Sequence, residues 1–121
     1  MINIAVRINK APVQDHEIHE VFRVVTAGIN SDYELGDLIV NGDADFGNWM
    51  MTVGDRPLQI VEHRAPEIKI QIDLSDDALE TDRDVENIMA LVRKGVDSGA
   101  SGGEIALRGS FLGEWEISYK K

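Results

Sequence analysis

The sequence predicts an α+β two-layer sandwich, in which a mainly antiparallel sheet of about five to seven strands carries two helices on one face. Residues 67–74 (EIKIQIDL) alternate strictly between isoleucine or leucine and polar side chains, as in a strand with one dry face and one wet face. Two other segments carry apolar residues at helical spacing. Helices and strands do not alternate regularly along the chain, which favours antiparallel over parallel pairing.

In chain order, the pattern predicts β-α-β-β-β-β-α-β-β. Residues 2–8 alternate as a strand, and Pro12 is a suitable first residue for a helix over about 12–28, with its apolar stripe centred on Phe22. SDYELGD is expected to be a loop and NGDADFGN a polar turn region. Short strands are expected near residues 38–40, 49–53 and 58–61, followed by the strand over 67–74.

The second helix is predicted to begin at a capping box formed by Thr81 and Asp84 and to continue to about residue 97. The glycine-rich DSGASGG ends it as a linker, and two last strands are expected at 104–108 and 115–119. We find no internal repeat in the sequence and expect a single domain over residues 1–121.

Composition narrows the chemistry and the compartment. The 121 residues include no cysteine, which excludes disulfides and thiolate chemistry. The opening MINIAVRINK alternates apolar with polar residues, unlike a signal peptide, and no run of about 18 apolar residues occurs. We therefore expect a cytoplasmic protein.

The net charge of −10 is concentrated in two windows. Residues 24–55 contain six acids and no base, and residues 73–86 contain seven acids and one base. The rest of the chain is slightly basic. This distribution disfavours direct binding of nucleic acid, which needs a basic surface, and favours a basic protein partner. Solubility alone is the other explanation for such acidity.

The segment QDHEIHE raises the question of a metal site. His16 and His19 lie on the polar flank of the predicted helix, where Glu20 or the distant His63 would be a third ligand. Arg23 falls on the same flank and would oppose a divalent cation. We therefore expect a solvated helix face and no bound cofactor. The weak metal candidates are His16, His19, Glu20 and His63.

The segment from Asn41 to Asn48 has the D-x-D spacing of calcium loops, but its glycine and its twelfth residue do not fit. An acidic hairpin loop beside Phe46 is the better interpretation, and such a loop is a plausible binding surface. Trp49 belongs either to that surface or to the core. No nucleophile elbow, thiol or phosphate-binding loop is recognisable, so we do not expect an enzyme.

We therefore expect an acidic, non-enzymatic domain that binds and inhibits a basic macromolecular partner. It would be either an immunity protein against a toxin or nuclease, or a phage-type inhibitor of a nucleic-acid-binding defence enzyme, with no membrane contact. The expected contact residues are Asp43, Asp45, Phe46, Asp76, Asp77, Asp82 and Asp84. One alternative is a small-ligand or metal-binding domain centred on the histidines. The other is an assembly module that pairs through a sheet edge, either residues 67–74 or the C-terminal hairpin. The oligomeric state stays open.

Overall fold

The computed structural model describes residues 1–10, 13–54, 67–107 and 109–119. Within these residues the chain forms six strands and two helices. In order they are β1 (Ile2–Ile8), α1 (Asp15–Asn30), β2 (Leu35–Val40), β3 (Asp43–Val53), β4 (Ile68–Leu74), α2 (Asp82–Asp97), β5 (Gly102–Leu107) and β6 (Ser110–Tyr119). The strand expected near residues 58–61 falls outside the described residues.

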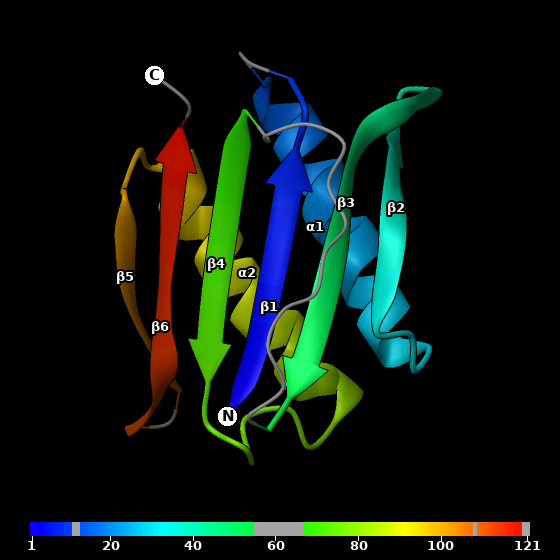
Figure 1. Cartoon of the computed structure of the whole chain (residues 1–121). Helices are drawn as coiled ribbons and strands as arrows, with labels where there is room; N and C mark the ends of the chain where they lie inside the picture. Colours follow the sequence, from blue (N-terminus) through cyan, green and yellow to red (C-terminus); the bar gives the residue numbers. More distant parts are fainter. Residues whose placement is uncertain (11–12, 55–66, 108, 120–121) are drawn as a thin grey trace.

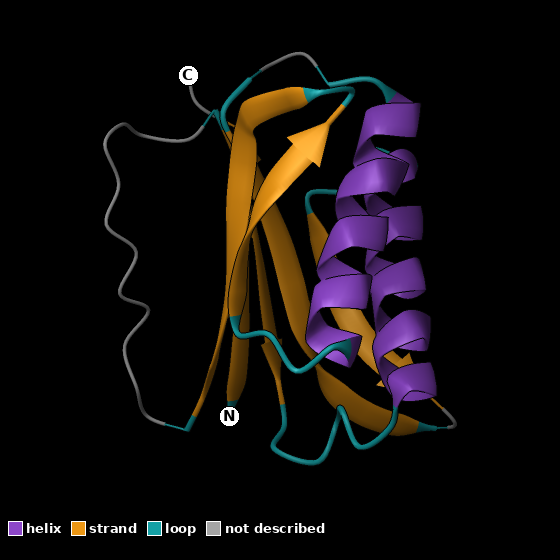
Figure 2. Ribbon diagram, turned by 90° about the vertical axis from the view of Figure 1, so that its right-hand side faces the viewer, coloured by secondary structure: helices purple, strands orange, loops and turns teal. Residues whose placement is uncertain are grey.

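The six strands form one antiparallel sheet in the order β2-β3-β1-β4-β6-β5 (Figure 1). Both helices lie side by side on the same face of this sheet (Figure 2). The predicted α+β two-layer sandwich is therefore confirmed. Among the described residues, no helix is long and apolar enough to cross a membrane.

The core lies between the helices and one face of the sheet. The isoleucines of β1 and β4 that alternate in the sequence all point into it, and they meet the apolar stripes of α1 and α2. Trp49 is 3% exposed, which settles its place in the core rather than in a binding surface.

Two local predictions need correction. α1 begins at Asp15 rather than near Pro12, because Glu17 accepts a hydrogen bond from the Gln14 backbone N–H (3.1 Å) and so caps the helix there. The expected polar turn over residues 41–48 is also wrong, because β3 already begins at Asp43. Asn41 (φ 55°) and Gly42 (φ 77°) turn the chain within two residues, as Asn-Gly pairs do in tight hairpins.

The structure also contains a repeat that we did not find in the sequence. The order β-α-β-β occurs twice, as β1-α1-β2-β3 and again as β4-α2-β5-β6. The two units meet where β1 pairs antiparallel with β4, and the strand order of one half mirrors that of the other. The chain is therefore two copies of one structural unit that share a single sheet.

Matching contacts show that particular residues of the two units are equivalent. Gly28 in α1 lies against the indole of Trp49, and Gly95 in α2 lies against the indole of Trp115 in the same way. The backbone bonds after the helices also match, since Tyr33 N–H donates to the Gly28 carbonyl (3.0 Å) and Ala100 N–H donates to the Gly95 carbonyl (3.1 Å). Gly28 is therefore equivalent to Gly95, Trp49 to Trp115 and Tyr33 to Ala100.

Candidate functional site

The acids predicted to bind a partner lie in two groups near opposite ends of β1. Asp43 and Asp45 follow the β2–β3 turn, near the end of β1. Asp76 and Asp77 follow β4, near the start of β1, and Asp82 and Asp84 lie in the first turn of α2. The two groups are therefore separated by the length of a seven-residue strand, roughly 20 Å (Figure 1). A partner that contacts both groups would need an interface at least this wide.

Several of these acids make hydrogen bonds or ion pairs within the fold. Asp43 Oδ1 accepts the Asp45 backbone N–H (2.9 Å). Asp84 Oδ2 accepts the Thr81 N–H while Thr81 Oγ1 accepts the Asp84 N–H, both at 3.2 Å, which confirms the predicted capping box. Asp76 pairs with the N-terminal ammonium, and Asp77 accepts a hydrogen bond from Ser75 Oγ (3.1 Å).

The carboxylates of Asp45 and Asp82, in contrast, make no hydrogen bond or ion pair with any described residue. Both residues are exposed. Reversing the charge of these two residues therefore removes no contact within the fold, although Asp82 also lies in the first turn of α2.

The assignment of Phe46 to the partner surface is wrong. Its side chain is 1% exposed and belongs to the core, with the Lys10 ammonium 5.4 Å from the centre of its ring. The reason is the alternation of β3, which starts at Asp43 and turns residue 46 toward the helices.

Sequence reasoning missed the one charged side chain that is buried among the described residues, Glu17. It lies in the first turn of α1, 2.8 Å from Lys10 Nζ, and accepts the Gln14 N–H. The Lys10 hydrogen bond, followed by the Gln14 N–H, lowers the pKa of the Glu17 carboxyl. This group ties the end of β1 to the start of α1, and its signal in the sequence was its place three residues after the N-cap.

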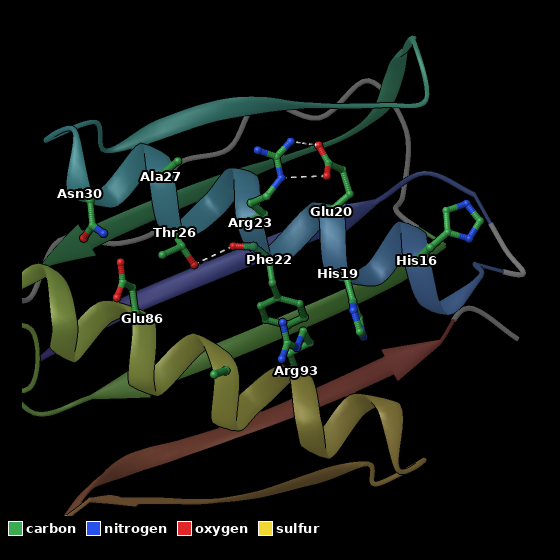
Figure 3. A pocket seen from close by; sticks show the side chains of 11 residues that line it. His16, His19, Glu20, Phe22, Arg23, Thr26, Ala27, Asn30, Glu86 and Arg93 are labelled. Carbon is green, nitrogen blue, oxygen red and sulfur yellow. Dashed lines mark hydrogen bonds and ion pairs between the residues drawn. The ribbon is translucent and has the colours of Figure 1, made fainter.

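His16 and His19 border a groove between α1 and α2 with a volume of about 630 Å³ (Figure 3). His19 Nε2 lies 2.7 Å from Asp97 Oδ2 across the two helices, and Arg23 pairs with Glu20 on the same helix. That pairing lowers the pKa of the Glu20 carboxyl. His19 and Glu20 thus both have partners of their own.

Among the residues described by the structure, no group of three or more His, Asp or Glu side chains is arranged to hold a metal ion. His63 lies outside them. Two other atoms near the helices lack a hydrogen-bond partner although they are buried, namely Arg93 Nε and Asn30 Oδ1, and both residues line the groove.

A different surface combines acids with large apolar side chains. We call it the β2 edge surface: Tyr33, Glu34, Leu35, Asp37 and Ile39. All five are exposed, and the three apolar members are 57–63% exposed. Their window has no basic residue. We missed this surface because SDYELGD looked like a loop, although Leu35, Asp37 and Ile39 alternate with the buried Leu38 and Val40.

A second acidic feature crosses the other half of the sheet, on the face opposite the helices. Asp73 in β4 lies directly beside Glu114 in β6, which lies directly beside Glu104 in β5. We call these three residues the carboxylate rung. Like charges directly opposite each other on neighbouring strands destabilise a sheet, so the fold alone does not account for them.

The alternative in which residues 67–74 form a sheet edge is wrong. These residues form β4, which is paired with β1 on one side and β6 on the other. The described edges are β2 and β5, so only β5 keeps part of the predicted C-terminal hairpin at an edge.

Comparison with known proteins adds no relative: no protein-family model, no curated protein and no solved structure matches the chain.

Proposed function

We propose that the protein is an acidic, non-enzymatic interaction domain that binds and inhibits a basic macromolecular partner. The observation that carries the proposal is the β2 edge surface, where Glu34 and Asp37 stand among three exposed apolar side chains. Protein interfaces combine apolar anchors with a polar rim, and complementary charge accelerates association and selects the partner.

The carboxylate rung supports the same proposal. Its three members repel each other in the free protein, and a cationic partner would relieve this repulsion. Glu34 and Asp37 in one feature, and Glu104 and Glu114 in the other, are exposed and therefore accessible to a protein surface. Such a domain fits an immunity protein against a toxin or nuclease, or a phage-type inhibitor of a nucleic-acid-binding enzyme.

The test is affinity capture from lysate of the source cells with three immobilised proteins. They are the wild type, a β2-edge reversal (Glu34→Lys, Asp37→Lys, Asp45→Lys) and a rung reversal (Asp73→Lys, Glu104→Lys, Glu114→Lys). The two variants change the net charge equally. We expect a basic protein that the wild type retains and that at least one reversal releases, and we expect the wild type to inhibit its activity.

Two results would contradict the proposal. One is that no basic protein is retained by the wild type. The other is that the retained protein is bound equally by all three, because binding would then not depend on either acidic feature. Circular dichroism of both variants checks that each is folded.

The interhelical groove favours a second candidate function, the binding of a small anionic ligand. Arg93 makes no ion pair with a described residue, and its buried Nε has no acceptor, so this N–H is left to donate to an anion, whereas Asn30 Oδ1 would need a hydroxyl of the ligand. Thermal unfolding with inorganic phosphate tests it, using the wild type and Arg93→Met. If phosphate raises the unfolding temperature of the wild type but not of Arg93→Met, the groove binds the anion. If phosphate shifts both proteins equally, the groove is not the binding site. Elemental analysis of protein purified without a histidine tag tests the metal version.

A further inference from the structure

The free edge of β2 has backbone groups available for another strand. Met51 N–H donates to the Glu34 carbonyl (2.7 Å), and Leu35 and Asp37 are the residues opposite Met50 and Asn48. Hydrogen-bonded pairs alternate with non-bonded pairs in an antiparallel ladder. The N–H and C=O groups of Leu35 and Asp37 therefore point away from β3, toward the edge where the described residues supply no strand.

The side chains along this edge follow a simple pattern. Leu35, Asp37 and Ile39 lie on the face of β2 that is turned away from the helices, in the order apolar, acidic, apolar. Leu35 is 61% exposed and Ile39 is 57% exposed. Exposed apolar residues on an edge strand favour strand addition, which natural edges usually prevent.

The second unit provides an internal comparison. Its edge strand, β5, carries Gly102 and Ala106 where β2 carries Leu35 and Ile39, while Glu104 keeps the acidic charge of Asp37. Upstream, Ala100 replaces Tyr33. The same structural unit thus forms a sheet edge with small side chains in one copy and with large apolar ones in the other. The fold itself does not require the apolar residues of β2.

We propose that an extended segment of the partner adds to β2 as a further strand, in which every second residue, on the face turned away from the helices, is in turn apolar, basic and apolar. A lysine or arginine of this segment lies opposite Asp37, and apolar residues cover Leu35 and Ile39. Backbone bonds supply affinity and the alternate side chains supply specificity. This inference rests on the proposed function and names the mode by which the basic partner binds.

A second copy of the chain fits the edge less well. Two β2 strands paired antiparallel and centred on Asp37 would place this carboxylate directly opposite its own copy, which is destabilising. A shift by two residues, the smallest that keeps the hydrogen-bonding pattern, would place it opposite Leu35 of the other copy. Charge complementarity therefore favours a basic segment over self-association.

The test is an amide ¹H–¹⁵N NMR titration of the full chain with two blocked heptapeptides. The lysine peptide, SVSKSVS, carries valine, lysine and valine at every second position and therefore on one face of a strand, and the glutamate peptide, SVSESVS, has glutamate in place of the lysine. We expect the lysine peptide to shift the amides of Leu35 and Asp37 with a Kd of about 1 mM or tighter. The amide of Glu104 in β5 should move little. The glutamate peptide should not bind.

Matched variants isolate the contribution of each edge. Asp37→Asn and the double change Leu35→Ser with Ile39→Ser should each weaken binding of the lysine peptide about tenfold, or about 1.4 kcal/mol. The equivalent changes in β5, Glu104→Gln and Ala106→Ser, should not. Circular dichroism separates lost binding from lost folding.

Three results would overturn the inference: no shifts on β2, equal shifts on β5, or equal binding of both peptides. A concentration-dependent dimer that Leu35→Ser abolishes in sedimentation would instead assign the edge to a second copy. If a captured basic partner depends on the acids but not on Leu35 and Ile39, the proposed function stands and strand addition falls.

Discussion

The clearest structural prediction concerns the two glycines that lie under tryptophans. A Cβ added to Gly28 would overlap the Trp49 indole, and one added to Gly95 would overlap the Trp115 indole. Both indoles are buried, at 3% and 5% exposure, so neither ring can move into solvent to make room. Gly28→Ala and Gly95→Ala should therefore both destabilise the protein.

The magnitude follows from two opposing effects. Alanine is better than glycine inside a helix by about 1 kcal/mol, which favours the variants. Overpacking a buried side chain costs about 1–3 kcal/mol. At both sites the added Cβ would collide with an indole ring that is itself buried, so we expect a cost toward the upper end of this range. We expect a net loss of about 1–2 kcal/mol in the free energy of unfolding at each site.

Urea unfolding, followed by circular dichroism, measures this loss, and a double-mutant cycle identifies its cause. Trp49→Phe removes the part of the ring that meets position 28, so Gly28→Ala should cost about 1–2 kcal/mol less in the Trp49→Phe background. If Gly28→Ala stabilises the wild type by its helix propensity, the packing argument is refuted. Opposite signs at Gly28 and Gly95 would refute the equivalence of the two units.

The other predictions concern charge, capping and salt. Glu17→Gln should lower the free energy of unfolding by about 1–3 kcal/mol at pH 7. The loss is smaller than for a fully buried ion pair because the Lys10 side chain is 45% exposed. The folded-state pKa of Glu17 is lowered, so its contribution is present above the unfolded pKa and is lost as pH falls through the folded pKa. Chemical denaturation at several pH values measures the difference in free energy of unfolding between wild type and Glu17→Gln. This difference should shrink below about pH 4, and a difference that stays constant with pH would contradict the argument. Thr81→Ala should lower the free energy of unfolding by about 1 kcal/mol through loss of the α2 cap, and an unchanged urea midpoint would contradict it. Binding of the basic partner should weaken with added salt, as surface plasmon resonance at two ionic strengths would show; salt-independent binding would count against an electrostatic interface.

The parts of the fold that were predictable are those with strong local signals. The strict alternation of residues 68–74 and the Thr81 capping box each specify one local structure, and both are found. The edge strand β2 was only partly predictable, because Gly36 and Asp37 resemble loop residues. Gly36 is needed there since a side chain would collide with the Trp49 indole, which is a tertiary contact that no local pattern reveals.

The duplication was hidden for a similar reason. What the two units share is a set of glycines and tryptophans at packing positions, such as Gly28 with Trp49 and Gly95 with Trp115, while the exposed positions between them differ. Side chains at exposed positions contribute little to the stability of the fold, so they can differ in charge and size between the two units. The β2 edge surface consists of such positions, which no pattern shared by the two units marks in the sequence.

The predicted contact acids show the limit of arguing from charge alone. The sequence located the acidic windows. It could not separate acids that accept backbone hydrogen bonds, such as Asp43 and Asp84, from acids whose carboxylate has no partner among the described residues, such as Asp45. It also could not show that strand alternation turns Phe46 inward.

The most direct test of the proposed function is the association rate constant of the captured basic partner with the wild type and with the Glu34→Lys, Asp37→Lys, Asp45→Lys variant, at low and at high salt. We predict that the variant associates at least about tenfold more slowly at low salt and that the difference shrinks at high salt. Equal rate constants at low salt for two folded proteins would contradict the claim that the acids of the β2 edge surface and its adjoining turn recruit the partner.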